Sequence, residues 1–255
     1  MNERKEYIEK SVKYYDERFG SSLSVSEKLN SEELNRLREI KSRVAQLTQD
    51  KERIYQLLDF GCGRGWIANE LQSFGKVSGI DLSPKTIELA KSKYPSVEFL
   101  CGDLGDPTFS ENLTSKFDLI VSSEVIEHLD MQDQFVSNIK KALKKYGRVV
   151  LTTPNGDFYD KYFNRSRKHW GQPIENWLTP KELSALFERN DFEIEKHYIF
   201  NSDWIFCIHV PGVPKLLNNR LTRKAFKNMS LQRIMSSTFR YSNYGLYQMI
   251  VAKSK

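Results

Sequence analysis

The fold is decided by ten residues, Leu57-Leu-Asp-Phe-Gly-Cys-Gly-Arg-Gly-Trp66, in which an apolar run enters a glycine-rich turn. Glycine tolerates a positive φ angle and lets a ligand approach the backbone closely. The first turn of a helix offers N–H groups that have no partner within the helix. The stretch therefore predicts a β-strand, a tight turn that can cradle a ligand, and a helix.

An acidic residue follows at the spacing that nucleotide-binding folds use. Asp81 lies twenty residues after Gly61, at the end of the next apolar run, where a carboxylate can accept hydrogen bonds from both ribose hydroxyls. This arrangement also suits NAD, but the dinucleotide fingerprint needs a small residue where Trp66 stands. Two alternatives remain open from these residues: a NAD-dependent oxidoreductase, and a glycine turn that only connects a strand to a helix.

Short apolar runs alternate with longer amphipathic stretches on either side of this motif. Such alternation predicts an α/β protein with a parallel sheet and right-handed crossovers. Pro84 after Ser83 and Pro180 after Thr179 each predict the first turn of a helix. The predicted strands are 54–60, 76–80, 97–100, 117–122, 148–152, 192–200 and 244–252, and the predicted helices begin near Trp66, Pro84, Met131 and Thr179.

Two further segments flank this core. Residues 1–50 carry apolar side chains at helical spacing and predict a helical N-terminal cap, with a helix that opens at Ser31. Residues 51–255 form the predicted α/β domain. About 201–240 make an insertion between the last two strands, longer than an ordinary connection, which we expect to form a lid or a substrate-contact segment.

Three more motifs follow the glycine turn in order: Val77-Ser-Gly-Ile-Asp-Leu-Ser-Pro84, Cys101-Gly-Asp-Leu104 and Phe117-Asp-Leu-Ile-Val-Ser-Ser-Glu-Val-Ile-Glu-His-Leu129. Over about residues 54–200 the chain resembles the class I S-adenosylmethionine-dependent methyltransferases. Thr153-Pro-Asn155 and Trp177-Leu-Thr-Pro-Lys-Glu-Leu183 are similar to motifs of the ubiquinone-biosynthesis type. The resemblance implies a Rossmann-like sheet of seven strands, mostly parallel, with helices on both faces and the last strand antiparallel.

The resemblance also implies which residues bind the cofactor, S-adenosylmethionine, and its product S-adenosylhomocysteine. The glycine turn would face the methionine part, Asp81 the ribose, and Asp103 the adenine amino group. An N-terminal aromatic segment would fold over the cofactor, although packing of its tyrosines in the core is an equal alternative. The implied cofactor-binding residues are Tyr15, Asp59, Gly61, Cys62, Gly63, Gly65, Asp81, Leu82, Asp103, Leu104, Ser123 and Glu124.

Two histidines are candidates for a catalytic base. A methyl group on a sulfonium is already electrophilic, so a base is needed only when the acceptor is a hydroxyl or an acidic carbon. His128 follows the fourth predicted strand, and His169 lies in the loop after the fifth. The alternative for His128 is a structural histidine at a helix start. Available histidines favour oxygen as the acceptor atom, with nitrogen and carbon still open.

The amino-acid composition limits the classes of protein to which the chain can belong. The chain has 255 residues with 39% apolar and 28% charged side chains, which describes a globular protein with a sizeable core. Its three cysteines are too few and too scattered for a disulfide framework or a metal site. Neither a signal peptide nor a spanning helix is evident, so the sequence predicts a cytoplasmic protein.

The charge is uneven along the chain. All acidic residues fall within 1–203, whereas nine cationic residues follow Asp203. Three alternatives remain open for the basic residues of 165–169 and 215–240. They would hold a small, phosphate-bearing acceptor, or 204–240 would contact an inner membrane surface, or the segment is a solvated lid or dimer surface. The motifs of base-modifying enzymes are absent from the sequence, which argues against a nucleic-acid substrate. A cofactor-binding scaffold without transferase activity, or an RNA methyltransferase, remains as the alternative function.

Overall fold

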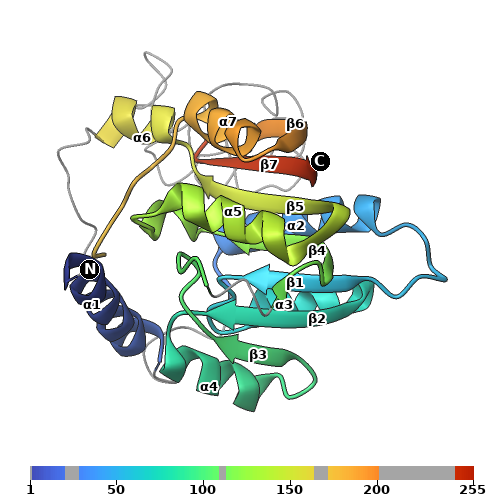
Figure 1. Ribbon diagram of the computed structural model, residues 1–255, viewed down its shortest axis with the longest axis horizontal. Helices are drawn as coiled ribbons and strands as arrows, with labels where there is room; N and C mark the ends of the chain where they lie inside the picture. Colours follow the sequence, from blue (N-terminus) through green and yellow to red (C-terminus); the bar gives the residue numbers. More distant parts are fainter. Residues whose placement is uncertain (1, 21–28, 109–112, 164–171, 201–244) are drawn as a thin grey trace, which may run out of the picture.

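The computed structural model describes residues 2–20, 29–108, 113–163, 172–200 and 245–255. Its centre is a seven-stranded sheet with the order β3-β2-β1-β4-β5-β7-β6 (Figure 1). The strands are β1 (Gln56–Phe60), β2 (Lys76–Asp81), β3 (Glu98–Cys101), β4 (Phe117–Ser123), β5 (Leu143–Pro154), β6 (Phe192–Phe200) and β7 (Tyr247–Ser254).

The described helices connect and cover these strands. They are α1 (Asn2–Phe19), α2 (Ser31–Leu47), α3 (Trp66–Leu71), α4 (Pro84–Lys93), α5 (Gln132–Ala142), α6 (Gly156–Phe163) and α7 (Pro180–Arg189), with single 3₁₀ turns η1 (Gln72–Phe74) and η3 (Ile126–His128). None of the helices in this described part combines the length and apolar composition that crossing a membrane requires.

The sheet is parallel except for its last strand, as the sequence predicted. β1 pairs with β2 and β4, and β4 pairs with β5, all in parallel. β7 inserts between β5 and β6 and is antiparallel to both. The predicted fold class, a Rossmann-like α/β sheet with a helical N-terminal cap, is therefore confirmed. The residue boundaries of the division at 50/51 stay a prediction, and the predicted insertion at 201–240 lies outside the described residues.

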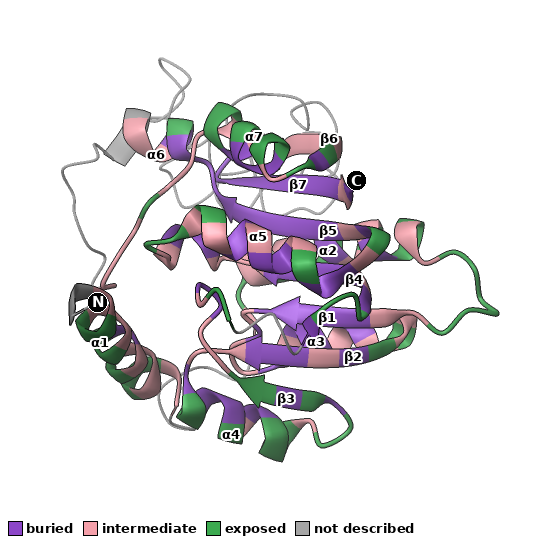
Figure 2. Cartoon of the chain, in the orientation of Figure 1, coloured by how far each residue is buried: buried purple, intermediate pink, exposed green. Residues whose placement is uncertain are grey.

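Both faces of the sheet are covered, because parallel strands connected by helices must bury apolar side chains on each side. Alternate residues of one strand enter opposite clusters: Leu57 packs with α2, α3 and α4, whereas Leu58 packs with α5 and α7. Figure 2 shows the resulting continuous buried centre of the sheet. α1 lies beyond the carboxyl ends of β1 and β2 and packs against α4 (Figure 1). In open α/β sheets this edge is where ligands bind.

Helix starts follow the predicted cap chemistry. The side chains of Ser83 and Thr179 accept hydrogen bonds from the backbone N–H groups of Thr86 and Glu182. α2 begins at Ser31, as predicted, and Asn30 before it forms a capping box with Glu33. Local polar side chains thus fix where these helices begin.

The start of one strand and the presence of one helix differ most from the sequence prediction. β5 begins at Leu143 rather than near residue 148, because α5 ends at Ala142 and the chain continues directly into the strand with a register shift against β4. The short helix α6 was not predicted. Its start depends on Asn155, whose carbonyl accepts hydrogen bonds from the N–H groups of Phe158 and Tyr159.

A buried amide fixes the loop that follows β3. The Asn138 side chain of α5 is fully buried and donates to the carbonyls of Leu104 at 2.9 Å and Asp106 at 2.8 Å. Each carbonyl would lose this hydrogen bond if the amide were removed, and losing a hydrogen bond to a buried polar group is costly. Asn138 therefore holds the loop at the functional edge of the sheet.

We expect Asn138→Ala to lower the free energy of unfolding by about 2–4 kcal/mol, because the buried carbonyl of Leu104 and the partly buried carbonyl of Asp106 each lose a hydrogen bond. Chemical denaturation monitored by circular dichroism measures the difference. Lys141→Ala, at an exposed position of the same helix, is the control and should change stability by less than about 0.5 kcal/mol. Equal stability of both variants would contradict this role of Asn138.

Candidate functional site

The turn after β1 has the backbone that its glycines predict. Gly61, Gly63 and Gly65 all have positive φ angles, at 91°, 49° and 79°. A Cβ atom at Gly61 would lie 2.2 Å from Val125, and one at Gly65 would lie 2.5 Å from Phe99, so close packing excludes side chains there. A Cβ at Gly63 would meet nothing within 4 Å. The turn is therefore closely packed at Gly61 and Gly65 and open at Gly63.

Asp81 connects this turn to the next helix. Its carboxylate accepts hydrogen bonds from the backbone N–H of Gly63 at 2.8 Å and of Ser83 at 3.0 Å. Burial raises the pKa of Asp81 although these N–H groups lower it. The carboxylate still lines a cavity, so it retains lone pairs for a ligand there.

That cavity has a volume of about 530 Å³ and lies over the carboxyl ends of β1, β2 and β4. The helix α1 forms its far wall with Tyr7, Ile8, Tyr15 and Phe19. Most of the residues predicted to bind the cofactor line it: Tyr15, Gly61, Cys62, Gly63, Asp81, Leu82, Asp103, Leu104, Ser123 and Glu124. The fold thus gathers residues that lie far apart in the sequence around one concave site.

Two of the predicted residues lie beneath the cavity and do not line it. Gly65 packs under Phe99 and Ala90. Asp59 is fully buried, and neither of its carboxylate oxygens makes a well-formed hydrogen bond. Burial raises the pKa of Asp59 to about 8, although the nearby backbone N–H of Ala68 lowers it. A buried carboxyl with so little hydrogen bonding is costly to keep, and it favours a nearby ligand that is cationic or donates hydrogen bonds.

Asp103 stands at the opposite end of the site, after β3. One oxygen accepts a hydrogen bond from the backbone N–H of Gly105 at 2.9 Å, and the other is 2.5 Å from Arg4 of α1. Burial raises the pKa of Asp103, while Gly105 and Arg4 lower it. Leu104 beside it is buried and offers an apolar surface.

The sequence reasoning missed Arg36, which lines the cavity from α2. Its guanidinium lies 3.7 Å from Glu124 and over the ring of Tyr247, 5.3 Å from the centroid. Its Nε atom is buried without a hydrogen-bond partner. One sequence signal existed: Arg36 lies four and eight residues before the buried Ile40 and Val44, on the apolar face of the helix.

Glu124 and Glu127 add two carboxylates beside Arg36. Glu124 has a positive φ of 57°, and its side chain accepts a hydrogen bond from Thr152 at 3.1 Å. Glu127 is buried and accepts one from Thr153 at 3.0 Å. Burial raises the pKa of each glutamate to about 7. The carboxylates of Glu124 and Glu127 therefore make this part of the site acidic, and the guanidinium of Arg36 offsets them in part.

The contacts of His128 define its proton positions. Nδ1 lies 3.2 Å from the carbonyl oxygen of Ile174, which can only accept, so Nδ1 carries the hydrogen. Burial lowers the pKa of His128, which favours the neutral ring at pH 7. Nε2 then carries the lone pair, 3.7 Å from Oε1 of the buried Glu127, and the residue lines the cavity beside the ring of Tyr15. His169, the other predicted base, lies outside the described residues.

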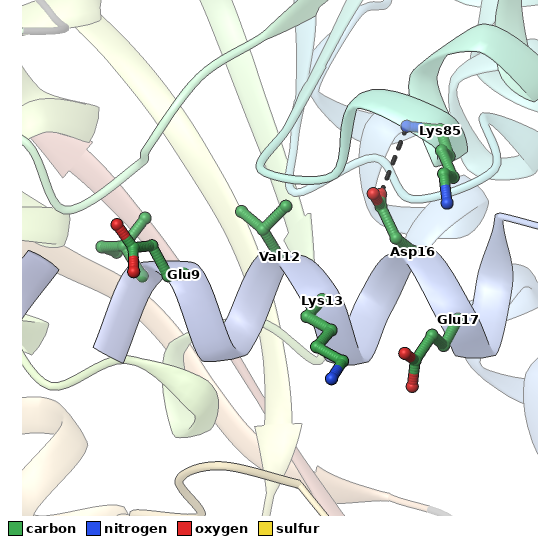
Figure 3. Close-up of a pocket in the computed structure, with 7 residues that line it drawn as sticks. Glu9, Val12, Lys13, Asp16, Glu17 and Lys85 are labelled. Atoms are coloured by element: carbon green, nitrogen blue, oxygen red, sulfur yellow. Dashed lines mark hydrogen bonds between the residues drawn. The ribbon is translucent and has the colours of Figure 1, made fainter. Parts of the chain in front are cut away.

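A second hollow of about 400 Å³ lies along the outer face of α1 and does not share the chemistry of the cavity (Figure 3). Glu9, Lys13 and Glu17 line it, together with Asp16 and Lys85. Asp16 accepts hydrogen bonds from the Ser83 hydroxyl at 2.6 Å and the Lys85 backbone N–H at 3.3 Å. This hollow is therefore the seam where α1 docks on the start of α4.

The comparisons with known proteins agree with this geometry. Residues 30–197 match a family model described as a methyltransferase domain. A ubiquinone biosynthesis O-methyltransferase of Pelagibacter ubique is 28% identical over 55% of this chain and 62% of its own length. A malonyl-[acyl-carrier protein] O-methyltransferase of Halalkalibacterium halodurans is 27% identical over 66% of this chain and 60% of its own length. The chain thus spans about 60% of the length of these relatives.

A solved structure shares the fold over nearly the whole chain. The putative sarcosine dimethylglycine methyltransferase of Galdieria sulphuraria superposes with a TM-score of 0.63, at 13% identity and over 98% of each chain. The matched family model covers more than half of the sequence and includes every strand from β1 to β5. The chain therefore belongs to the S-adenosylmethionine-dependent methyltransferases, as the sequence motifs predicted.

Proposed function

We propose that the protein transfers a methyl group from S-adenosylmethionine to a hydroxyl group of a small molecule. One observation carries the proposal: a neutral imidazole whose Nε2 is unprotonated lines the same cavity as the strand-end carboxylates Asp81 and Asp103. The cofactor supplies a methyl group activated on sulfur. The protein has to hold it, align the acceptor, exclude water and accept a proton.

The carboxylates suit the neutral parts of the cofactor. Asp81, already fixed by two backbone N–H groups, would accept hydrogen bonds from the ribose hydroxyls. Asp103 would accept one from the amino group of adenine, and Leu82 and Leu104 would contact the base. Each role matches an acceptor to a donor or an apolar side chain to a flat apolar face.

The other carboxylates suit its cationic end. Glu124 lines the cavity at this end together with the hydroxyl of Ser123, and Asp59 lies buried beneath it. A nearby cation stabilises the ionised carboxylates and so lowers the pKa values that burial raises. The acidic excess of this end therefore fits a ligand that brings both an ammonium and a sulfonium group.

Arg36 would bind the carboxylate of the methionine part. Its guanidinium has an unpaired buried Nε donor, and a charge-assisted pair with a ligand carboxylate would satisfy it. Burial lowers the pKa of Arg36, but Glu124 and other neighbouring acids raise it by more. The net pKa is therefore raised, and the guanidinium stays charged. The arginine thus suits the anionic group of an otherwise cationic amino-acid end.

His128 would act as the base for the acceptor hydroxyl. Ile174 fixes the ring through Nδ1, and the Tyr7 hydroxyl donates to the backbone carbonyl of His128. These contacts leave Nε2 as the proton acceptor. Relatives named O-methyltransferases support an oxygen acceptor over nitrogen or carbon.

The identity of the acceptor stays a prediction. The basic residues 165–169 and 215–240, which favour a phosphate-bearing molecule, lie outside the described residues, as does the membrane contact predicted for 204–240. A cytoplasmic location also stays a prediction. The second candidate function is a cofactor-binding scaffold without transfer, and a transfer assay separates the two.

We expect S-adenosylhomocysteine, but not NAD, to bind in isothermal titration calorimetry. We also expect radiolabelled methyl transfer from S-adenosylmethionine to members of a panel of phenols and catechols, with phosphorylated and lipid-linked forms included. An amine panel is the control for the acceptor atom. Product binding without transfer to any panel member would favour the scaffold, and NAD binding alone would overturn the assignment.

Arg36→Gln should weaken binding of S-adenosylhomocysteine by about 10- to 100-fold, because a charge-assisted pair with its carboxylate is lost. Binding of methylthioadenosine, which lacks the amino-acid part, should stay within about twofold. Arg38→Gln, on the exposed face of α2, is the matched control. An equal loss for both ligands would mean that Arg36 only supports the fold of the cavity.

His128→Asn should lower kcat by about 10²- to 10⁴-fold and leave the affinity for S-adenosylhomocysteine unchanged, because a general base is removed. In the unsubstituted protein, kcat should fall as the pH drops below the ordinary pKa of histidine, 6.5, because protonation fills the Nε2 lone pair. The depressed pKa places that loss below 6.5. Stopped assays from pH 5 to 9 should find this acid limb absent in His128→Asn; near-normal turnover of the variant would exclude the role.

A further inference from the structure

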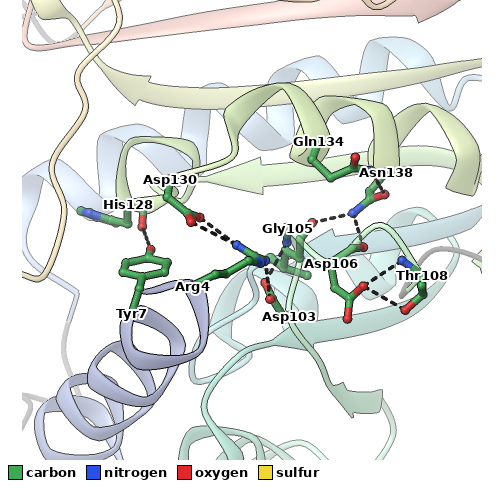
Figure 4. A network of polar contacts seen from close by, with 11 residues as sticks. Arg4, Tyr7, Asp103, Gly105, Asp106, Thr108, His128, Asp130, Gln134 and Asn138 are labelled. Atoms are coloured by element: carbon green, nitrogen blue, oxygen red, sulfur yellow. Dashed lines mark hydrogen bonds and ion pairs between the residues drawn. The ribbon is translucent and has the colours of Figure 1, made fainter. Parts of the chain in front are cut away.

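An arginine near the start of α1 connects the carboxylates of two loops, Asp103 and Asp130 (Figure 4). Arg4 Nη2 lies 2.5 Å from Asp103 Oδ2, and Nη1 lies 3.0 Å and 3.2 Å from the two oxygens of Asp130. Asp103 follows β3, whereas Asp130 follows η3. One guanidinium thus spans two loops that belong to different parts of the site.

The helix that carries Arg4 is held in place independently of this contact. One turn further along, the Tyr7 hydroxyl donates to the carbonyl of His128. Near the other end of α1, the Asp16 carboxylate accepts from the Ser83 hydroxyl at 2.6 Å. Arg4 is therefore presented to Asp103 from a fixed element, and its direction is set by packing that does not involve the ion pair.

The ion pairs of Arg4 contribute little to the stability of the fold. The side chains of Arg4, Asp103 and Asp130 are 27%, 20% and 29% exposed, and ion pairs at such positions contribute little to folding. The effect on Asp103 is more specific. Burial opposes its ionised form, and Arg4 and the Gly105 N–H are the groups that favour it.

The remaining hydrogen-bonding capacity of Asp103 faces the cavity that it lines. Gly105 N–H takes one site on Oδ1 and Arg4 takes one on Oδ2. A carboxylate oxygen has two lone pairs, so both oxygens can still accept. With its two outer sites fixed, the carboxylate is ionised and oriented before a ligand arrives.

We propose that Arg4 is a positioning residue that fixes Asp103 as an acceptor and so makes the site selective for a 6-aminopurine over a 6-oxopurine. This inference rests on the proposed function. An amino group at the 6-position donates to the fixed carboxylate, whereas an oxo group there presents a second acceptor and is repelled. Arg4 also donates to Asp130, so the same guanidinium contacts both the carboxylate that would bind the base and the loop that follows His128.

The test compares two ligands that differ only at this position, S-adenosylhomocysteine and its deaminated analogue S-inosylhomocysteine, by titration calorimetry with the full chain. Arg4→Gln should weaken binding of the amino compound by about 5- to 20-fold and change binding of the oxo compound by less than about twofold, because one oriented, charged acceptor is lost. The ratio of the two affinities therefore falls. Lys5→Gln, an exposed charge on the same helix, is the matched control and should leave the ratio unchanged.

Two further variants sharpen the result. Arg4→Lys keeps the charge and should recover part of the ratio, although a single ammonium cannot reproduce the two-sided contact. Asp130→Asn removes the second anchor of Arg4 and should lower the ratio less than Arg4→Gln does. Thermal melts of the free variants should shift only slightly, as expected for partly exposed ion pairs.

Three outcomes would overturn the inference. An unchanged ratio in Arg4→Gln, with both affinities equally reduced, would mean that Arg4 only docks α1. Unchanged affinities for both ligands would remove any role for Arg4 in binding. Failure of the unsubstituted protein to bind S-adenosylhomocysteine would overturn the proposed function and this inference together, and that result is distinguishable because no variant is needed to observe it.

Discussion

The structure depends on one carboxylate bridge at the carboxyl edge of the sheet. Asp81 ends β2 and accepts from the N–H groups of Gly63 and Ser83, so it joins the glycine turn after β1 to the start of α4. Both segments would otherwise expose backbone donors at a site where water is partly excluded. The same acceptor also lines the cavity, so the interaction that shapes the turn prepares a ligand contact.

The charge distribution around this bridge is unfavourable for an empty protein. Asp59 and Glu127 are buried, and the pKa values of Asp59, Glu124 and Glu127 all rise because of burial. Arg36 offsets only part of this acidity. These buried acids lower the stability of the fold, and under the proposed function they complement a ligand that is cationic at one end and donates hydrogen bonds at the other.

The helix α1 completes the site although it precedes the sheet by more than thirty residues. It contributes Tyr7 and Tyr15 to the cavity wall and holds three strand-end loops through Arg4, Tyr7 and Asp16. The alternative that its tyrosines only pack in a core does not describe Tyr15, which lines the cavity and contacts Gln172. Its side chains reach both the adenine-facing and the acceptor-facing parts of the proposed site.

Local sequence determined the alternation of strands and helices, the glycine turn with its positive φ angles, the caps at Ser83 and Thr179, and the acids that follow each strand. Such features depend on neighbours within a few residues, and short-range sterics and hydrogen bonds decide them. Arg4, Arg36 and the proton position on His128 could not be read this way. Their roles arise from contacts with Asp103, Glu124 and the Ile174 carbonyl, at separations that only chain folding closes. Tertiary structure alone decided these partners, because burial and the distance between charges are properties of the packed chain rather than of any segment.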